Sequence, residues 1–268
     1  MIRLPIDDVL ADIRNALNMH CRVVLQAPPG AGKTTAVPIA LLDQTWSKGK
    51  KIIMLEPRRL AARNAAARMA FLLGEKVGQT VGYQIRQDSC YSEDTRILVL
   101  TEGILTRKLQ ADPELTGTAL VIFDEFHERS LHADLSLALC LQSQQVLRED
   151  LKMLVMSATL NTAAIADLLD DETSEQTPVI QSEGRSYPVE NIYLDRAIKQ
   201  NGRAAHSAAL ISTITMTVKH VIEHHQGSCL VFLPGVKEIN RVLSEIKRYL
   251  QSSTIDNIKL APLHGSLS

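Results

Sequence analysis

A short run of small residues that ends in lysine and threonine is the most informative stretch of the sequence. Residues 27–34 are Ala-Pro-Pro-Gly-Ala-Gly-Lys-Thr, between an apolar segment and a segment of helical character. Gly30 and Gly32 let the backbone turn so that successive N–H groups point into one hollow. The helix that follows directs its positive end at an anion. Lys33 could then reach the β- and γ-phosphates of a nucleotide, and Thr34 could place its hydroxyl on Mg²⁺.

The run departs from the pattern G-x-x-x-x-G-K-[ST] at one position, where Ala27 replaces the first glycine. A methyl group is small, and we expect it to be tolerated. The alternative interpretation is a glycine-rich turn that only caps a helix. The lysine and threonine directly after Gly32 favour a phosphate-binding loop instead.

Acidic residues follow an apolar segment farther along the chain. Residues 119–123 are apolar throughout, and Asp124, Glu125 and His127 come directly after them. Acids that leave a buried strand at its carboxyl end lie where open α/β sheets bind ligands. Asp124 is the candidate ligand for Mg²⁺, and Glu125 is the candidate general base for an attacking water. His127 could couple this site to a neighbouring element. An ordinary polar strand end is the alternative, and it is a stronger alternative for His127 than for the two acids.

A hydroxyl-bearing turn follows the next apolar segment. Ser157 and Thr159 flank Ala158 directly after residues 153–156. Alone, such a turn is most often a strand exit or the N-cap of a helix. This turn is nevertheless a candidate functional element, because it ends the next expected strand after Asp124 and Glu125.

Two further strand ends carry residues suited to a phosphate backbone. Between residues 48 and 68 there are seven basic residues and one acid, Glu56, in a chain that is nearly neutral overall. Guanidinium groups and helix N–H groups that face one side suit a polymer backbone. A solvated helix face is the alternative for residues 48–68. A simple helix cap is the alternative for residues 101–103, which follow another expected strand. The candidate nucleic-acid-binding residues are Pro57, Arg58, Arg59, Thr101, Glu102 and Gly103.

Short β-branched segments alternate with longer helical patterns in the part of the chain that carries these motifs. Strands are expected over residues 23–26, 51–55, 96–101, 119–123, 153–156 and 179–181. Helices are expected over residues 34–42, 60–73, 103–111, 131–147 and 162–169. This alternation predicts an α/β fold, a parallel sheet with helices on both faces.

The pattern changes after Gly184. We expect a first domain over residues 1–184 and a second over residues 185–268, with residues 184–190 as a connector and a polar surface loop over 170–177. The second domain is expected to hold a helix over 206–225, a strand over 229–233, an amphipathic helix and a last strand over 258–261. The apolar face of that amphipathic helix consists of Val236, Ile239, Leu243, Ile246 and Leu250.

Composition narrows the class of protein. The 268 residues include 29 Lys and Arg against 30 Asp and Glu, and 45% are hydrophobic, which excludes a disordered charged tail, a collagen and a coiled coil. The four cysteines are too scattered for a zinc ribbon or a redox pair, and they fit a reducing compartment. No segment resembles a signal peptide or a membrane span, so a cytoplasmic location is expected.

Taken in order, the motifs resemble those of superfamily 2 helicases, specifically the DEAH-box RNA helicases, and most closely the bacterial HrpB-type group. Phe126 stands where the box has alanine. Six stretches carry the resemblance: Gly-Ala-Gly-Lys-Thr-Thr (30–35), Glu-Pro-Arg-Arg-Leu-Ala-Ala (56–62), Thr-Glu-Gly (101–103), Asp-Glu-Phe-His-Glu-Arg (124–129), Ser-Ala-Thr-Leu (157–160) and Leu-Val-Phe-Leu-Pro-Gly (230–235).

The resemblance implies two RecA-like domains with ATP and Mg²⁺ between them and single-stranded RNA across their top. Arg59 and Thr101 would hold the nucleic-acid backbone, and Arg68 would stack on adenine. Ser157 and Thr159 would couple hydrolysis to movement. The residues that it places around ATP are Gly30, Ala31, Gly32, Lys33, Thr34 and Thr35.

The resemblance also implies a longer protein. The family continues past residues 262–267 into a Thr-rich coupling motif and an Arg-rich motif that completes the ATPase site, whereas this sequence stops at Ser268. We expect residues 185–268 to be the N-terminal part of an incomplete second RecA-like domain. An arginine supplied across the cleft is commonly worth ~10³–10⁵ in rate, so we expect slow hydrolysis of ATP by this chain.

Three functions remain open at this point. The leading hypothesis is an ATP-driven RNA motor. A DNA-directed motor is the second, because backbone contacts alone do not tell the two sugars apart. The third is a module that binds nucleotide and nucleic acid without turnover. A protein-translocating ATPase is disfavoured, because it has no need for residues 57–59 and 101–103.

Overall fold

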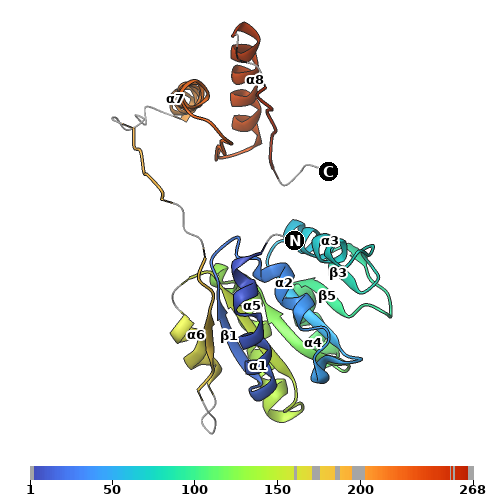
Figure 1. The fold of residues 1–268 in the computed structure, drawn as a ribbon. Coiled ribbons are helices and arrows are strands. Elements are labelled where there is room, and N and C mark those ends of the chain that lie inside the picture. Colours follow the sequence, from blue (N-terminus) through green and yellow to red (C-terminus); the bar gives the residue numbers. More distant parts are fainter. Residues whose placement is uncertain are drawn as a thin grey trace. The chain divides into compact units, whose positions relative to one another are not determined.

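The computed structural model of the chain describes residues 3–159, 162–170, 176–184, 188–194, 203–253, 255 and 257–264. The chain divides into two compact units, Met1–Pro188 and Val189–Ser268 (Figure 1). Parts of some expected features lie outside the described residues: Leu160, residues 171–175 of the polar loop, 185–187 of the connector, and 265–267.

One eight-stranded sheet runs through the first unit, in the order β4-β3-β5-β2-β6-β7-β1-β8. All neighbouring strands are parallel except β3 and β4, which form an antiparallel hairpin. The predicted α/β class with a parallel sheet is confirmed. The strands are Arg22–Gln26 (β1), Lys51–Glu56 (β2), Val81–Ile85 (β3), Asp88–Cys90 (β4), Ile97–Thr101 (β5), Thr118–Phe123 (β6), Lys152–Ser157 (β7) and Val179–Gln181 (β8).

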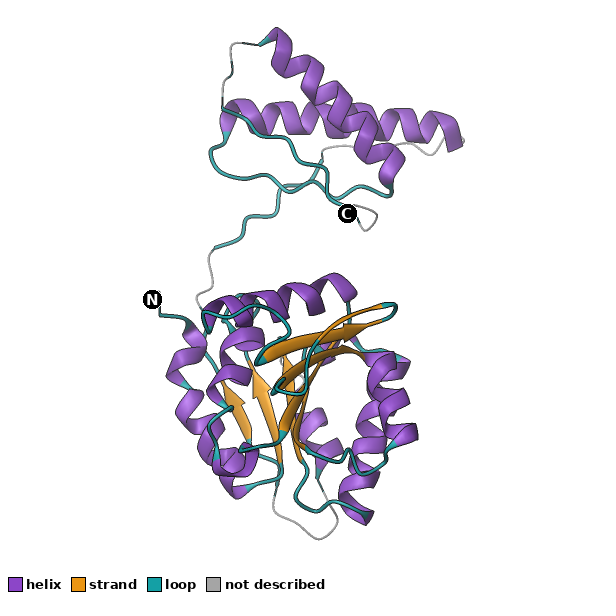
Figure 2. Ribbon diagram, turned by 90° about the vertical axis from the view of Figure 1, so that its right-hand side faces the viewer, coloured by secondary structure: helices purple, strands orange, loops and turns teal. Residues whose placement is uncertain are grey.

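Helices cover both faces of this sheet (Figure 2). The α-helices of the first unit are Leu10–Met19 (α1), Lys33–Ala40 (α2), Arg59–Leu72 (α3), Glu102–Ala111 (α4), Leu131–Val146 (α5) and Thr162–Leu169 (α6). Three short 3₁₀ helices, η1 to η3, span Pro5–Asp8, Thr45–Ser47 and Phe126–Glu128.

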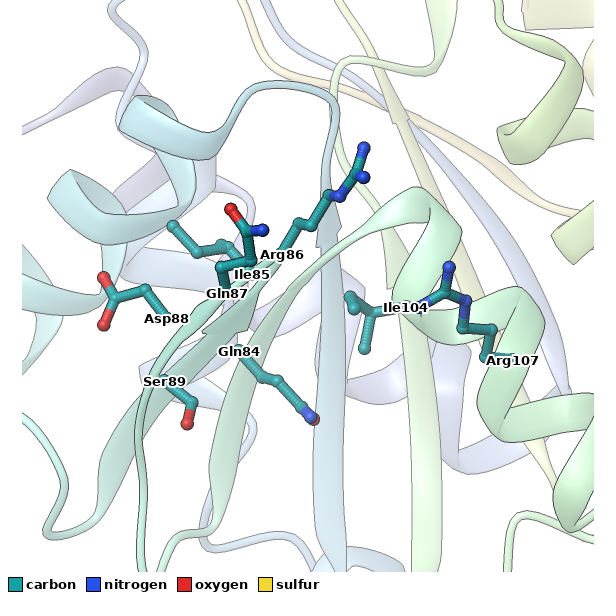
Figure 3. Close-up of a pocket in the computed structure, with 8 residues that line it drawn as sticks. All are labelled: Gln84, Ile85, Arg86, Gln87, Asp88, Ser89, Ile104 and Arg107. Carbon is teal, nitrogen blue, oxygen red and sulfur yellow. The ribbon is translucent and has the colours of Figure 1, made fainter.

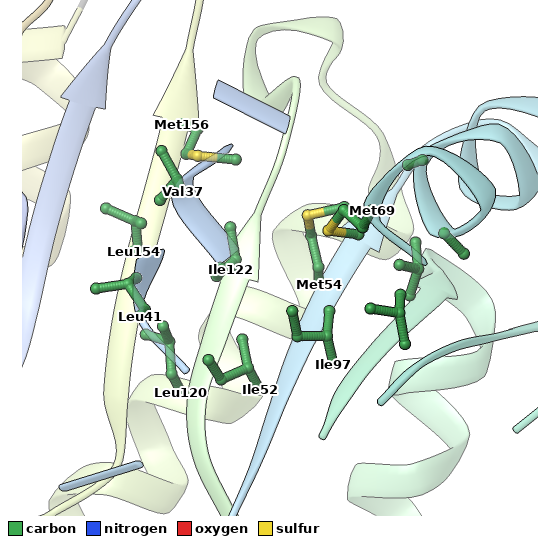
Figure 4. Close-up of a cluster of buried hydrophobic side chains, with 14 of the residues drawn as sticks. Val37, Leu41, Ile52, Met54, Met69, Ile97, Leu120, Ile122, Leu154 and Met156 are labelled. Carbon is green, nitrogen blue, oxygen red and sulfur yellow. The ribbon is translucent and has the colours of Figure 1, made fainter. Parts of the chain in front are cut away.

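Alternate residues of each central strand serve two separate hydrophobic clusters. Ile52 and Met54 of β2 belong to the cluster under α1, α2 and α3, part of which is drawn in Figure 4. Ile53 and Leu55 belong to the cluster under α4, α5 and α6. Because side chains alternate between the faces of a strand, a strand covered on both faces must be apolar at every position. The continuous apolar segments of the sequence have this origin.

The six strands and five helices expected in the first unit are all present, with boundaries that differ by a residue or two. The sequence patterns missed α1 and the hairpin of β3 and β4. The hairpin turn is hard to recognise because Gln87, at φ +68°, occupies a left-handed position that usually carries Gly or Asn.

The described part of the second unit contains two helices that pack against each other, Arg203–His224 (α7) and Val236–Ser252 (α8). Ile246, from the predicted apolar face of α8, is buried, but Val242, which is outside that face, is buried as well, and Val236 of the face is 41% exposed. None of the helices in the described part of the chain has the length and apolar character that a membrane crossing requires.

Two strand predictions in the second unit are wrong. Residues 229–233 and 258–261 form no strand, and Leu230 and Phe232 are 69% and 87% exposed. A strand needs a neighbour to satisfy its backbone hydrogen bonds, and no strand lies within the described part of this unit to provide one.

Candidate nucleotide-binding site

The phosphate loop joins β1 to α2 with the backbone that its glycines permit. Gly30 and Gly32 have φ of +79° and +95°, in the left-handed region that favours glycine. A Cβ at Gly32 would also lie only 2.7 Å from Cδ1 of Leu4. Gly32 is the N-cap of α2, so the positive end of the helix faces the loop.

Two short contacts join the loop to the end of β6. Nζ of Lys33 lies 2.8 Å from Oε1 of Glu125, and the hydroxyl of Thr34 donates to Oδ2 of Asp124 at 2.5 Å. Lys33 and Asp124 are only 3% and 5% exposed. Strand β7 separates β1 from β6 in the sheet, so the sheet order brings these distant segments together at its carboxyl edge.

Glu56 is a third carboxyl group of this site that the sequence patterns did not mark. It ends β2, is 3% exposed, and lies beside Asp124. Burial, and then the neighbouring Asp124, raise the pKa of Glu56 to about 9. Burial also raises the pKa of Asp124, although Thr34 and Lys33 oppose that rise. In the sequence, Glu56 begins the motif over residues 56–62, but only its neighbours in the sheet showed that its carboxyl group belongs to this site.

His127 connects the acidic residues to the turn after β7. Its Nε2 lies 3.3 Å from Oε2 of Glu125, and its Nδ1 accepts a hydrogen bond from the amide of Ala158 at 3.2 Å. In that turn the hydroxyls of Ser157 and Thr159 lie 3.2 Å apart. The structure therefore brings the two predicted coupling residues next to the ring of His127.

Glu125 has an unusual backbone. Its φ of +49° and ψ of +36° are in the left-handed region, although it is not glycine. The Glu125 amide donates to Oδ1 of Asp124 at 2.8 Å, which stabilises this conformation. Strained residues of this kind concentrate at functional sites.

A hollow of about 340 Å³ opens beside these groups. Its walls come from the start of α2, the end of β2, the exposed face of α3 and the acidic segment after β6. The guanidinium of Arg68 lies 5.4 Å from the centre of the Phe71 ring. The residues that line the hollow are Thr34, Thr35, Glu56, Pro57, Arg58, Ala61, Asn64, Ala65, Arg68, Glu125 and Glu128.

The candidate nucleic-acid residues lie at the ends of β2 and β5, which are neighbours in the sheet. Arg59 is exposed at the first turn of α3, and Arg58 forms an ion pair with Glu128 at 2.8 Å. Thr101 is the N-cap of α4 but makes no side-chain cap hydrogen bond. The carboxylate of Glu102 instead accepts a hydrogen bond from the hydroxyl of Ser130, which supports a structural role for that side chain.

A second hollow, of about 610 Å³, lies between the β3–β4 hairpin and α4 (Figure 3). Arg86 of the hairpin turn and Arg107 of α4 bring two cationic side chains to it. The buried Oε1 of Gln84 has no hydrogen-bond partner among the described residues. This hollow was missed because the hairpin was missed.

The donor groups fit ATP with Mg²⁺. Mg²⁺ prefers oxygen ligands and usually keeps several waters, binding through one or two protein groups and substrate phosphates. Thr34 and Asp124 provide two such oxygens. Among the described residues, no group of three His, Cys, Asp or Glu side chains is arranged to hold a metal ion by itself. Lys33 and the start of α2 provide the positive charge that phosphates require.

The chain is similar to known helicases over its whole length. It is 48% identical over 268 residues to the ATP-dependent RNA helicase HrpB of Escherichia coli, covering all of this chain and 31% of that protein. It is 32% identical to the ATP-dependent RNA helicase HrpA of Borreliella burgdorferi, covering 99% of this chain and 30% of that protein. A crystal structure of Escherichia coli DEAH/RHA helicase HrpB matches with a TM-score of 0.85 and 47% identity, over 99% of this chain and 32% of that one.

These curated relatives are much longer than this chain, which spans about a third of their length. Their similarity nevertheless includes both units. A family model described as DEAD/DEAH box helicase matches residues 10–168, which hold every motif assigned above to the first unit. The chain belongs to the DEAD/DEAH box helicase family.

Proposed function

We propose that this chain is the ATP-binding part of an ATP-dependent RNA helicase. The observation that carries the proposal is the pair of contacts between the phosphate loop and the end of β6. A buried lysine and a hydroxyl meet two carboxylates there, at 2.8 Å for Lys33 and Glu125 and 2.5 Å for Thr34 and Asp124. Nucleotide hydrolysis needs these four groups together: a phosphate clamp, two metal ligands and a base.

The geometry supports a division of roles. Lys33 would exchange its contact with Glu125 for the β- and γ-phosphates, and this leaves Glu125 able to accept a proton from water. His127 would hold Glu125 through the oxygen that Lys33 does not contact. Thr34 and Asp124 would hold Mg²⁺, which neutralises phosphate charge when bound. Arg68, on the wall of the hollow, would cover the adenine.

The proposed polymer is single-stranded RNA, bound through its backbone. Arg59 and Thr101 lie at the carboxyl edge of the sheet with side chains that make none of the described hydrogen bonds or ion pairs. Arg86, which follows β3, and Arg107, on the helix that follows β5, add positive charge to the hollow between the β3–β4 hairpin and α4. The relatives named above are RNA helicases, which favours RNA over DNA.

We assign residues 1–184 to a first RecA-like domain and residues 185–268 to the N-terminal part of a second. The absence of strands from the described part of the second unit supports an incomplete domain. Its Arg241 and Arg248 lie on α8, and Arg248 is paired with Glu245 at 2.9 Å. We assign neither of them as the arginine that assists phosphoryl transfer. The four free cysteines support a cytoplasmic location.

Binding measurements on the chain test this function. A fluorescent ADP analogue should bind in the presence of Mg²⁺, and labelled single-stranded RNA should bind with an affinity that falls steeply with salt. Competition with single-stranded DNA at fixed salt then separates an RNA motor from a DNA motor. Failure of the nucleotide to bind would refute the proposal, and ATP turnover with and without RNA separates a motor from a binding module.

A further inference from the structure

Gly184 lies unusually close to the phosphate loop. A Cβ built on Gly184 would lie 2.1 Å from Cγ, 3.1 Å from Cβ and 3.3 Å from Cδ of Pro28. Apolar carbon atoms in ordinary contact lie about 4 Å apart, so no side chain fits between Gly184 and this ring. The φ of Gly184 is outside the left-handed region, so the approach of Pro28, and not the backbone conformation, is what requires glycine here.

Two adjacent strands bring these residues together. Strand β8 pairs in parallel with β1, with Gln181 opposite Gln26. The pairing continues past the end of both strands, because the amide of Ser182 donates to the carbonyl of Gln26 at 2.8 Å. The chain that leaves β8 therefore runs beside the chain that leaves β1, and the latter becomes the phosphate loop.

Pro28 is itself part of the loop's internal structure. Its carbonyl accepts a hydrogen bond from the amide of Ala31 at 3.2 Å, which closes the turn that contains Gly30. On the opposite side, the amide of Ala27 donates to the carbonyl of Ser157 at 3.0 Å. A displacement of the Pro28 ring would therefore change the backbone that is to hold the phosphates.

We propose that Gly184 is a positioning residue for the phosphate loop, and that the loop and the chain segment leaving β8 move together as one body. This inference rests on the proposed binding of nucleotide at the loop. The residues after Gly184 lead into the second unit, so the coupled movement would reach the beginning of that connection. A loop that shifts when it binds nucleotide would shift the start of that connection as well.

The test is a double-mutant cycle on Gly184 and Pro28, read out by titration of a fluorescent ADP analogue with Mg²⁺. Gly184→Ala should raise Kd about tenfold, since the added methyl must push the Pro28 ring. Combining Gly184→Ala with Pro28→Ala should return Kd to about that of Pro28→Ala alone, because the space for the methyl is restored. Glu183→Ala, an exposed neighbour in the same segment, is the matched control and should bind like the parent protein.

Equal affinity for the parent and Gly184→Ala would overturn the inference, and so would a double variant as weak as Gly184→Ala. If the parent itself does not bind ADP, the proposed function fails instead. Should Gly184→Ala not fold, hydrogen exchange on Pro28→Ala gives an independent answer. Loss of the ring should accelerate exchange of the Ser182 amide together with that of Ala31, and unchanged exchange at Ser182 would contradict the coupling.

Discussion

The imidazole of His127 accepts a hydrogen bond at Nδ1 from the backbone amide of Ala158, at 3.2 Å. Since Nδ1 is the acceptor, the proton of the neutral ring is on Nε2, the atom that lies 3.3 Å from Oε2 of Glu125. One ring therefore contacts both the acidic residue proposed as the base and the turn that contains Ser157 and Thr159. A movement of Glu125 would therefore displace the turn through the ring of His127, and a movement of the turn would displace Glu125.

Removing the ring of His127 should loosen the turn after β7 without disturbing nucleotide binding. In His127→Ala the Ala158 amide loses its acceptor, and we expect its hydrogen exchange to accelerate by roughly tenfold. The Kd for the ADP analogue should stay close to the parent value, because the phosphate loop makes its own contacts. His132→Ala removes an exposed histidine of α5 and is the control. Unchanged exchange at Ala158 would contradict the assignment of this contact.

Nucleotide binding should depend on Lys33. Replacing it with alanine removes a buried positive charge next to the proposed phosphate position, which costs about 2–4 kcal/mol of binding free energy. Titration with the ADP analogue should show Kd raised thirtyfold or more. Lys50→Ala, which removes a partly exposed lysine paired with Asp150, should bind like the parent. If Lys33→Ala also binds like the parent, the assignment of the phosphate loop is wrong.

The two acids after β6 should separate by their effects. Glu125→Gln retains the shape of the side chain but removes the base, so binding of ATP and Mg²⁺ should persist while turnover by the longer protein is abolished. Asp124→Asn should instead raise the Mg²⁺ concentration needed for tight nucleotide binding. Parental turnover by Glu125→Gln would exclude the general-base role.

Glu56 should make the ligand-free protein less stable as the pH rises. Its pKa is raised from 4.5 to about 9 in the folded state, so between these values the unfolded chain releases a proton that the folded protein keeps. The penalty is absent below pH 4.5 and grows through the interval, to a few kcal/mol. Glu56→Gln should therefore raise Tm at pH 8 and change it little at pH 4. The same change at both pH values would show that Glu56 has no raised pKa.

RNA affinity should depend on Arg59 through charge alone. In Arg59→Ala the affinity for single-stranded RNA should fall, and the slope of log K against log salt should become less steep by about one ion. Preference among RNA sequences should not change, since backbone contacts carry no base information. Arg241→Ala, an exposed arginine of α8, is the control. A changed sequence preference without loss of affinity would argue against a backbone contact.

Short sequence patterns were enough to predict several features of this protein. The segment 119–123 predicted a buried parallel strand because such a strand must be apolar at every position. The phosphate loop was also predictable, because its glycines, Lys33 and Thr34 act within a few residues of one another. Those features depend on a short piece of chain and on rules that hold in any protein.

Tertiary structure alone decided which of these pieces meet. The order of strands in the sheet placed Asp124 against Thr34, brought Glu56 beside them and set Gly184 against Pro28. The lack of a neighbouring strand in the described part of the second unit left residues 229–233, although apolar and β-branched in part, without strand structure. The physical reason is that strand pairing and burial are gained between segments far apart in the chain. Their free energy depends on which neighbours are present, and a local pattern does not contain that information.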